Sequence, residues 1–319
     1  MLSNYHYFLT LAEELNIARA AEKLFISHQC LSKYLKKLEK ECGTVLFQRK
    51  PRFALTYAGE RMLESLRQIE MIEQNLTDQF TDIQSGSTGE VRIGIPEGRL
   101  RILMPELIEQ FKQTYPSVDL RVASAGPSAL VEMLENNKVD LVATTDPHIP
   151  LSSIRRKILL KERLYLVISD NMLREYFPSE YPGCIDRFRS GANLSDFRHV
   201  PFVLNHPGFT SRDMLDAYLR NTGTALRCTN EIQAMDLHHL MTARDFAASF
   251  ALTMYLPGIE QLSDTATSYS ELYVFPIQGF GETNDFVLLS PKDRIFPQYT
   301  LHAISLLQKL CGQYQQYDL

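Results

Sequence analysis

The first sixty residues place apolar side chains with the period of an amphipathic helix, in three short segments. They recur at steps of three and four over 3–15, 17–24 and 28–41, which predicts three consecutive helices around one core. The stripes are Tyr7, Phe8, Leu11, Ala12 and Leu15, then Ile17, Ala20, Ala21 and Leu24, then Leu31, Leu35 and Leu38.

The residue types at the ends of these segments agree with the helices. Ser3 or Asn4, Asn16 and Ser27 each precede a predicted helix and carry a side-chain oxygen that can cap its free N–H groups. Gly43 follows the third segment, where a left-handed residue commonly ends a helix.

Residues 46–56 predict a hairpin with a basic turn. Leu46 and Phe47 lead into the turn at 48–52, which Pro51 stiffens, and 53–56 form the returning strand. A helix, a turn, a second helix and a basic hairpin are typical of a winged helix-turn-helix, which places one helix in the major groove of DNA.

Residues 58–84 predict one long helix with an imperfect heptad pattern. The first apolar row is Met62, Ile69, Leu76 and Ile83, and an incomplete second row contains Leu66 and Phe80. This pattern favours a seam between two copies of the helix; the alternative is a helix packed on its own domain. The sequence Ser-Gly-Ser-Thr-Gly at 85–89 predicts a short flexible linker.

From residue 90 the pattern changes to short apolar runs that alternate with helical stripes. Strands at 91–95, 118–123 and 140–143, with helices at 100–114 and 129–136, imply a parallel sheet with ligand loops at the carboxyl ends of its strands. Residues 96–99 are expected to form a loop and Ser128 to cap the second helix. A second such unit is predicted from strands at 164–168, 201–204, 226–228, 274–277 and 286–290, helices at 211–220, 233–242 and 298–311, and an apolar run at 250–256.

These patterns predict three parts in the chain. An all-α winged helix-turn-helix domain covers 1–58, and a long linker helix with a hinge covers 59–89. An α/β domain of two lobes covers 90–319, with lobe I at about 90–163 and 279–319 and lobe II at about 164–278. Two small α/β lobes with a cleft between them fit a periplasmic-binding-protein-like sensor.

Charge is concentrated in the predicted DNA-reading segment. Residues 17–56 contain nine basic and three acidic side chains, a net charge of +6, although the whole chain carries −5 and the remainder therefore −11. One basic segment in an acidic chain indicates that a polyanion binds there. The alternative is a helix face that water merely solvates.

Other features exclude several classes of protein. No basic segment precedes an apolar one at the N-terminus, and no apolar run approaches the length of a membrane span, so a cytoplasmic protein is expected. The five cysteines are odd in number and lack CxxC spacing, which argues against zinc ribbons and disulfide frameworks.

A spaced set of residues resembles the N-terminal pattern of the LysR-type transcriptional regulators. The set is Phe8, Leu9, Ala12, Ala20, Ala21, Leu24, Ser27, Leu31, Ser32, Leu38, Glu39, Gly43, Leu46, Phe47, Arg49, Leu55, Thr56, Ala58 and Gly59. The chain departs from the family at His28 and Gln29, where Gln-Pro is common, and at Lys33, where Arg is frequent. The resemblance extends over the two-lobed domain with weaker motifs.

The resemblance implies a DNA-binding regulator of transcription. It implies a homodimer or tetramer joined through the linker helix, an inverted-repeat promoter site in double-stranded DNA, and a small-molecule effector in the cleft. RNA polymerase is a further expected partner, and no membrane, cofactor or metal is expected. The residues expected at the DNA are Ser27, His28, Gln29, Ser32, Lys33, Lys36, Lys37, Arg49, Lys50 and Arg52.

The expected effector site follows from the loops at the strand ends. Its residues are Glu97, Gly98, Arg99, Leu100, Ala125, Gly126, Ser128, Thr144 and Thr145 from lobe I, and Asn205, His206, Thr210 and Arg244 from lobe II. Helix starts after Gly98 and Gly126 can hold an anion, and Arg99, Arg101 and Arg244 can pair with a carboxylate or phosphate. A small anionic metabolite is therefore the hypothesis, and surface salt bridges are the alternative role of the arginines.

Catalysis has no signature in the chain. The segment 236–239 offers an aspartate and two histidines, but adjacent histidines on a helix point about 100° apart and share no metal-binding face. The motifs HExxH, GxSxG, GxxxxGK[ST] and GxGxxG are missing from the sequence. The competing predictions are a small-solute-binding protein and a redox-sensing regulator that uses Cys184 and Cys228.

Overall fold

The computed structural model describes residues 4–50, 52–84, 89–147, 152–265 and 269–317. They form two compact units, Met1–Gln84 with Arg294–Phe296, and Ser85–Asp293 with Pro297–Leu319. The cap at Ser3, the turn proline Pro51 and most of the predicted 85–89 linker lie outside the described residues. None of the described helices is both long enough and apolar enough to cross a membrane.

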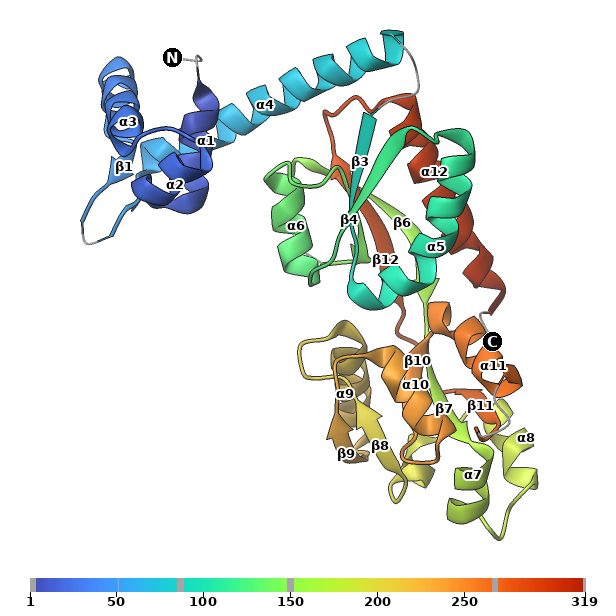
Figure 1. The fold of residues 1–319 in the computed structure, drawn as a ribbon. Coiled ribbons are helices and arrows are strands. Elements are labelled where there is room, and N and C mark those ends of the chain that lie inside the picture. The colour runs from blue at the N-terminus through green and yellow to red at the C-terminus, as the bar shows by residue number, and fades with distance from the viewer. Residues whose placement is uncertain (1–3, 51, 85–88, 148–151, 266–268, 318–319) are drawn as a thin grey trace. The chain divides into compact units, whose positions relative to one another are not determined.

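The first unit contains the predicted winged helix-turn-helix. Its elements are α1 (Tyr5–Glu14), α2 (Ile17–Lys23), α3 (His28–Cys42), the strands β1 (Phe47–Gln48) and β2 (Ala54–Leu55), and α4 (Tyr57–Gln84) (Figure 1). The two strands pair antiparallel. The buried core is made of Phe8, Leu9, Leu11, Ala20, Ala21, Leu31, Leu35, Leu38, Leu46, Phe47 and Leu66.

The helix ends confirm three of the predicted caps. The side chain of Asn16 accepts hydrogen bonds from the backbone N–H groups of Ala18 and Arg19, and Ser27 accepts one from Cys30. Gly43 ends α3 in the left-handed conformation, at φ +68°. The prediction for Asn4 was wrong, because its side chain makes no capping bond and its backbone is itself left-handed.

The long helix α4 divides its apolar stripe between two environments. Leu66 is buried in the core of the first unit, and Met62 and Ile69 pack against that core. Farther along, Ile72, Leu76 and Phe80 are 62%, 49% and 56% exposed. The first half of the helix therefore packs Met62, Leu66 and Ile69 on its own domain, and the second half exposes Ile72, Leu76 and Phe80. The side chain of Ile83 lies outside the described residues.

Lobe I of the second unit is built on a five-stranded sheet in the order β4-β3-β5-β12-β6. The strands are β3 (Gly89–Gly94), β4 (Val118–Ala123), β5 (Leu141–Thr145), β6 (Ile154–Glu162) and β12 (Asn284–Pro291). The first three are parallel, as predicted, but β12 runs antiparallel to both of its neighbours. The helices α5 (Glu97–Thr114) and α12 (Gln298–Gln313) lie together on one side, and α6 (Pro127–Glu135) lies on the other (Figure 1).

Lobe II has an antiparallel sheet in the order β10-β7-β11, from β7 (Leu164–Ser169), β10 (Ser249–Leu252) and β11 (Leu272–Pro276). A parallel pair, β8 (Pro201–Leu204) and β9 (Arg227–Glu231), joins it through a bridge between Phe202 and Ala248. The helices are α7 (Asp170–Tyr176), α8 (Gly183–Arg189), α9 (Thr210–Thr222), α10 (Met235–Ala243) and α11 (Leu256–Thr265). Because only residue 163 separates β6 from β7, the chain passes between the lobes almost without a turn.

Several predicted boundaries were wrong. Residues 96–99 are not a loop, since α5 already begins at Glu97. The cap of α6 is Gly126 and Pro127 is its first residue, so Ser128 lies inside the helix. The strand β6 and the helices α7, α8 and α11 were not predicted, and Leu15 is exposed rather than part of the core.

Candidate functional site

The α3 helix presents one apolar and one polar face. Leu31, Leu35 and Leu38 are buried in the core of the first unit. The other face exposes His28, Gln29, Lys33, Lys36 and Lys37 and leaves Ser32 half-buried. The side chain of Ser27 caps the start of α3. The first residues of the helix are therefore held in helical geometry.

Most basic side chains of this surface lack an acidic partner. Lys33, Lys36, Arg49, Lys50 and Arg52 form no ion pair with any described residue. Lys37 Nζ lies 3.8 Å from Glu41 Oε1, at the limit of a salt bridge. The acidic side chains that the structure describes therefore leave most of the positive charge of α3 and of the hairpin uncompensated.

Polar bonds that sequence reasoning missed fix the hairpin to its neighbouring helices. Glu39 Oε1 on α3 accepts hydrogen bonds from the backbone N–H groups of Leu46 at 2.9 Å and Phe47 at 3.2 Å. At the other end, the Thr56 hydroxyl donates to the Val45 carbonyl at 2.7 Å and accepts from Gly59 N at 3.1 Å. The only indication of these two residues in the sequence was that Glu39 and Thr56 belong to the spaced set that resembles the family pattern.

Gly59 allows α4 to approach the start of the hairpin. A Cβ atom at this position would lie 2.2 Å from the Leu46 carbonyl oxygen. Gly59→Ala is expected to lower the free energy of unfolding by about 1–3 kcal/mol, because a backbone atom must move. Thermal unfolding measures the change. The matched control is Gly312→Ala on α12, where a Cβ meets no atom within 4 Å; there the higher helix propensity of alanine should leave stability unchanged or raise it.

Arg99, predicted to bind an anion, is paired inside the protein. Its Nη2 lies 2.5 Å from Glu162 Oε2, and both side chains are buried. The guanidinium lies over the rings of Tyr255 and Phe286, at 4.8 and 5.4 Å from their centroids. Burial raises the pKa of Glu162, while Arg99 and the Met254 N–H oppose the shift. The pair joins α5 to the last residue of β6, where the chain leaves lobe I for lobe II.

The other predicted residues of lobe I lie at helix starts and at a strand end. Glu97, Gly98 and Leu100 belong to the first turn of α5, and a Cβ at Gly98 would lie 2.3 Å from the Tyr255 hydroxyl. Ala125, Gly126 and Ser128 lie at the start of α6, and Thr144 and Thr145 end β5. The buried Thr144 hydroxyl has no hydrogen-bond partner among the described residues.

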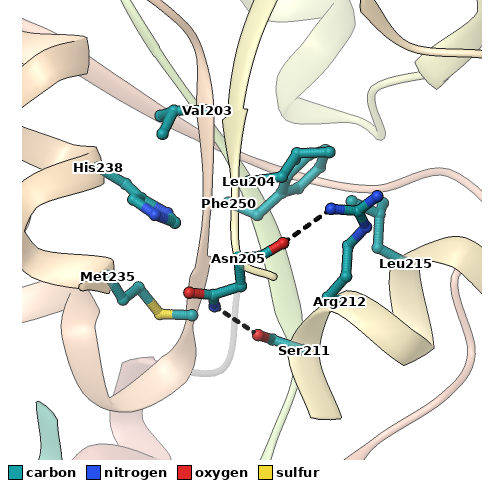
Figure 2. A pocket seen from close by; sticks show the side chains of 9 residues that line it. All are labelled: Val203, Leu204, Asn205, Ser211, Arg212, Leu215, Met235, His238 and Phe250. Atoms are coloured by element: carbon teal, nitrogen blue, oxygen red, sulfur yellow. Dashed lines mark hydrogen bonds between the residues drawn. The ribbon is translucent and has the colours of Figure 1, made fainter. Parts of the chain in front are cut away.

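Asn205 lies directly after β8 and is 8% exposed. Its Nδ2 donates to Ser211 Oγ at 2.9 Å, and its backbone carbonyl oxygen accepts from Arg212 Nη1 at 2.7 Å (Figure 2). A cavity of about 20 Å³ lies beside it, between the end of β8, the start of α9 and the start of α10. His206 is exposed and Thr210 begins α9.

Arg101 connects the two lobes near this cavity. It donates hydrogen bonds to the carboxylate of Asp236, at the start of α10, and to Glu97 Oε1 at 2.6 Å. Since Met235 and His238 on α10 line the cavity, the starts of α5, α9 and α10 lie close together. Asp236, Ser211 and Arg212 were not predicted as site residues, because their pairing depends on contacts far apart in the sequence.

The structure does not bring Arg244 together with this group. Arg244 follows α10 at its other end, about 12 Å along the helix axis from Asp236. Its guanidinium stacks on the Tyr269 ring at 5.4 Å. The next residue, Asp245, adopts a left-handed φ of +63° and accepts a hydrogen bond from Ser169, at the end of β7.

The histidines and cysteines of lobe II have structural environments. His238 Nε2 donates to the Ile232 carbonyl at 2.7 Å, and burial lowers the pKa of the neighbouring His239 to about 4. Groups of three or more potential metal ligands do not occur among the described residues. Cys184 is buried, and burial raises the pKa of its thiol. Cys228 is an exposed residue, but partial desolvation of its thiol raises that pKa as well, so the reactive thiolate fraction of both cysteines is lowered.

Comparison with known proteins agrees with this architecture. Residues 2–60 match the bacterial regulatory helix-turn-helix model of the lysR family, and 84–310 match the LysR substrate binding domain. The RuBisCO operon transcriptional regulator of Allochromatium vinosum is 26% identical over 312 residues, which cover 94% of this chain and 95% of that protein. The regulator XapR of Escherichia coli is 29% identical over 72% of this chain and 75% of its own length.

Solved structures share the fold. A full-length OxyR variant from Pseudomonas aeruginosa superposes with a TM-score of 0.67 at 20% identity, covering 98% of this chain and 94% of that one. Full-length CbnR in complex with its target DNA superposes with a TM-score of 0.54 at 19% identity, covering 95% of this chain and 97% of that one. Both domain models together span nearly the whole chain, so the protein belongs to the LysR family of bacterial regulators.

Proposed function

We propose that this chain is a transcriptional regulator that binds promoter DNA and responds to a small molecule bound between its two lobes. The observation that carries the proposal is the capped α3 helix, whose polar face and adjacent hairpin hold five basic side chains without acidic partners among the described residues. A rigid basic helix over a packed core suits the major groove and its phosphates.

The contacts divide by chemistry. His28, Gln29, Ser32 and Lys33 approach base edges, because the first turns of a recognition helix reach the groove floor. Lys36, Lys37, Arg49, Lys50 and Arg52 hold phosphates, and Ser27 fixes the start of the helix. The proposed DNA site is an inverted repeat, because its two halves match two copies of the chain related by a twofold axis.

The proposed regulator works without catalysis, in the cytoplasm where bacterial promoters are found. An effector shifts the arrangement of the lobes, and α4 passes the shift to the spacing of the two DNA readers. RNA polymerase would then meet a differently shaped promoter complex. The solute-binding alternative leaves the first unit without a role, and the raised thiol pKa values of Cys184 and Cys228 disfavour the redox alternative.

Fluorescence anisotropy tests the proposal most directly. The full-length protein is titrated into DNA from immediately upstream of its own gene and into random DNA, at two salt concentrations. Tighter, salt-sensitive binding to the upstream fragment is expected. Equal binding to both fragments at both salt concentrations contradicts the proposal.

Two substitutions on α3 should separate phosphate contacts from base contacts. Lys36→Ala is expected to weaken binding to both DNA fragments by a similar factor and to reduce the slope of log K against log salt by about 1. Gln29→Ala is expected to remove about 1–3 kcal/mol of discrimination between the fragments. Identical behaviour of the two variants in anisotropy titrations would rule out this division of roles.

The exposed half of α4 should hold the dimer together. Leu76→Glu places a charge between Ile72 and Phe80, so sedimentation velocity is expected to show a smaller species at micromolar concentration. Leu301→Glu on α12 is the matched control, because Leu301 is 44% exposed and lies on another helix. If both variants keep the parent's sedimentation coefficient, α4 is not the seam.

A further inference from the structure

Asn205 leaves one buried hydrogen-bond acceptor unused. Its Oδ1 has no partner among the described residues, although the side chain is 8% exposed and its Nδ2 is bonded to Ser211. Figure 2 shows this oxygen directed away from Ser211, toward the side of the cavity that carries Met235 and His238. Buried polar groups are normally paired, so an unpaired oxygen beside a cavity indicates that a donor enters there.

The size and chemistry of the cavity limit that donor. A volume of about 20 Å³ accommodates one group of the size of water or ammonium. His238 uses its Nε2–H to bond the Ile232 carbonyl, so its Nδ1 is the unprotonated nitrogen and a second acceptor. The cavity, lined by residues of lobe II, therefore fits the donating tip of a ligand.

Arg212, which lines the cavity, and Arg101 are each paired with two carboxylates. Arg101 forms ion pairs with both Glu97 and Asp236. This group of one arginine and two carboxylates has a net charge of −1. Arg212 forms the second group, since its Nε lies 2.9 Å from Asp216 Oδ1 and its Nη1 lies 2.9 Å from Glu231 Oε1.

The helix starts are also occupied by carboxylates. Glu97, Asp213 and Asp236 lie in the first turns of α5, α9 and α10, where they interact favourably with the positive helix ends. Only α6, of the four helix starts considered for this site, has no acid in its first turn. The arginines and helix ends that suggested an anion from the sequence are therefore largely satisfied by the protein's own acids.

We propose that the effector of this chain carries a primary amine, which is protonated at neutral pH and donates to Asn205 Oδ1 in this cavity. The inference rests on the proposed function and specifies the ligand of its two-lobed domain. An ammonium ion supplies three donors to the acceptors of Asn205 and His238, and its charge is complementary to the two groups of net −1.

Isothermal titration calorimetry on the full-length protein decides between ligand classes. The probes are 1,4-diaminobutane, butane-1,4-diol and succinate, which share a four-carbon skeleton and differ in charge, at pH 7.5 and one ionic strength. The diamine is expected to bind at least tenfold more tightly than the diol, and succinate more weakly than either. Succinate binding as tightly as the diamine, or no binding by the diamine, overturns the proposal.

Variants connect the result to the cavity. Asn205→Asp adds a negative charge at the acceptor and is expected to tighten diamine binding at least tenfold, whereas Asn205→Leu should abolish it. Thermal unfolding of each variant shows whether it is folded. The control Arg244→Ala, on the far end of α10, should bind the diamine as the parent does. Unchanged diamine affinity in folded Asn205→Leu contradicts the assignment.

Failure of this inference is distinguishable from failure of the proposed function. If succinate binds and alters anisotropy with the upstream DNA fragment, the regulator stands and the amine is wrong. If the upstream fragment is not preferred over random DNA, the proposed function fails, and calorimetry still determines which probe the lobes bind.

Discussion

Arg99→Met is expected to lower the free energy of unfolding by about 3–5 kcal/mol, the usual result of removing one partner from a buried ion pair. Glu162 is fully buried, and Arg99 supplies the charge that opposes its desolvation. The variant also loses the guanidinium that lies over the rings of Tyr255 and Phe286. Chemical denaturation with urea measures the difference.

The double variant Arg99→Met/Glu162→Met provides the control. It removes both charges and is expected to recover most of the lost stability, because no buried charge remains unpaired. The single variant should also depend more strongly on pH than the parent. Burial already raises the pKa of Glu162, and loss of Arg99, which lowers that pKa, raises it further, so the folded variant keeps a proton that the unfolded state releases above about pH 4.5. Its stability deficit should therefore be larger at pH 8 than at pH 5, and an equal deficit at both would exclude the buried carboxylate as the cause.

Acidification is expected to destabilise the protein through His239. Burial lowers its pKa from 6.5 to about 4, so the unfolded state binds more protons between these two values. The contribution of neutral His239 to the free energy of unfolding is complete above pH 6.5 and disappears as the pH falls toward 4. About 2 kcal/mol is lost by pH 5 and about 3 kcal/mol in total. His238 should add to the loss, since burial lowers its pKa as well.

Thermal unfolding of matched variants between pH 7.5 and 5 isolates the His239 contribution. His239→Leu places an apolar side chain against Tyr255, loses the hydrogen bond to the Phe250 carbonyl, and should reduce the acid sensitivity by about 2 kcal/mol at pH 5. His199→Gln, at an exposed histidine of the same lobe, should behave as the parent does. A parent and a His239→Leu variant with the same pH profile would assign the acid effect to other groups.

Local sequence signals predicted most of the first unit. The stripe of Leu31, Leu35 and Leu38 lies in the core, and Asn16 and Ser27 cap the helices that follow them. Helical periodicity and capping depend on residues within one or two turns, so they are readable without tertiary contacts. The pairing of Glu39 with the start of the hairpin spans seven residues and required the folded chain to be seen.

Local signals were less informative in the two-lobed domain. The strand β6 has the sequence IRRKILLKE, in which exposed lysines and arginines interrupt the buried Ile154, Leu159, Leu160 and Glu162, so its pattern lacks the alternation of a strand. It was missed because pairing with β12, which lies far away in the chain, stabilises it. Likewise, residues 96–99 resemble a loop in composition, yet packing extends α5 to Glu97.

Helix period, caps and charge are local properties, so the family architecture and the position of the basic reading helix could be predicted from the residues alone. The roles of the arginines, in contrast, depend on contacts between distant parts of the chain. Arg99 and Arg101 find their carboxylates at Glu162 and Asp236, more than sixty residues away, and Arg244 lies at the far end of its helix. The arginines are satisfied by these long-range pairings, which no short stretch of sequence encodes.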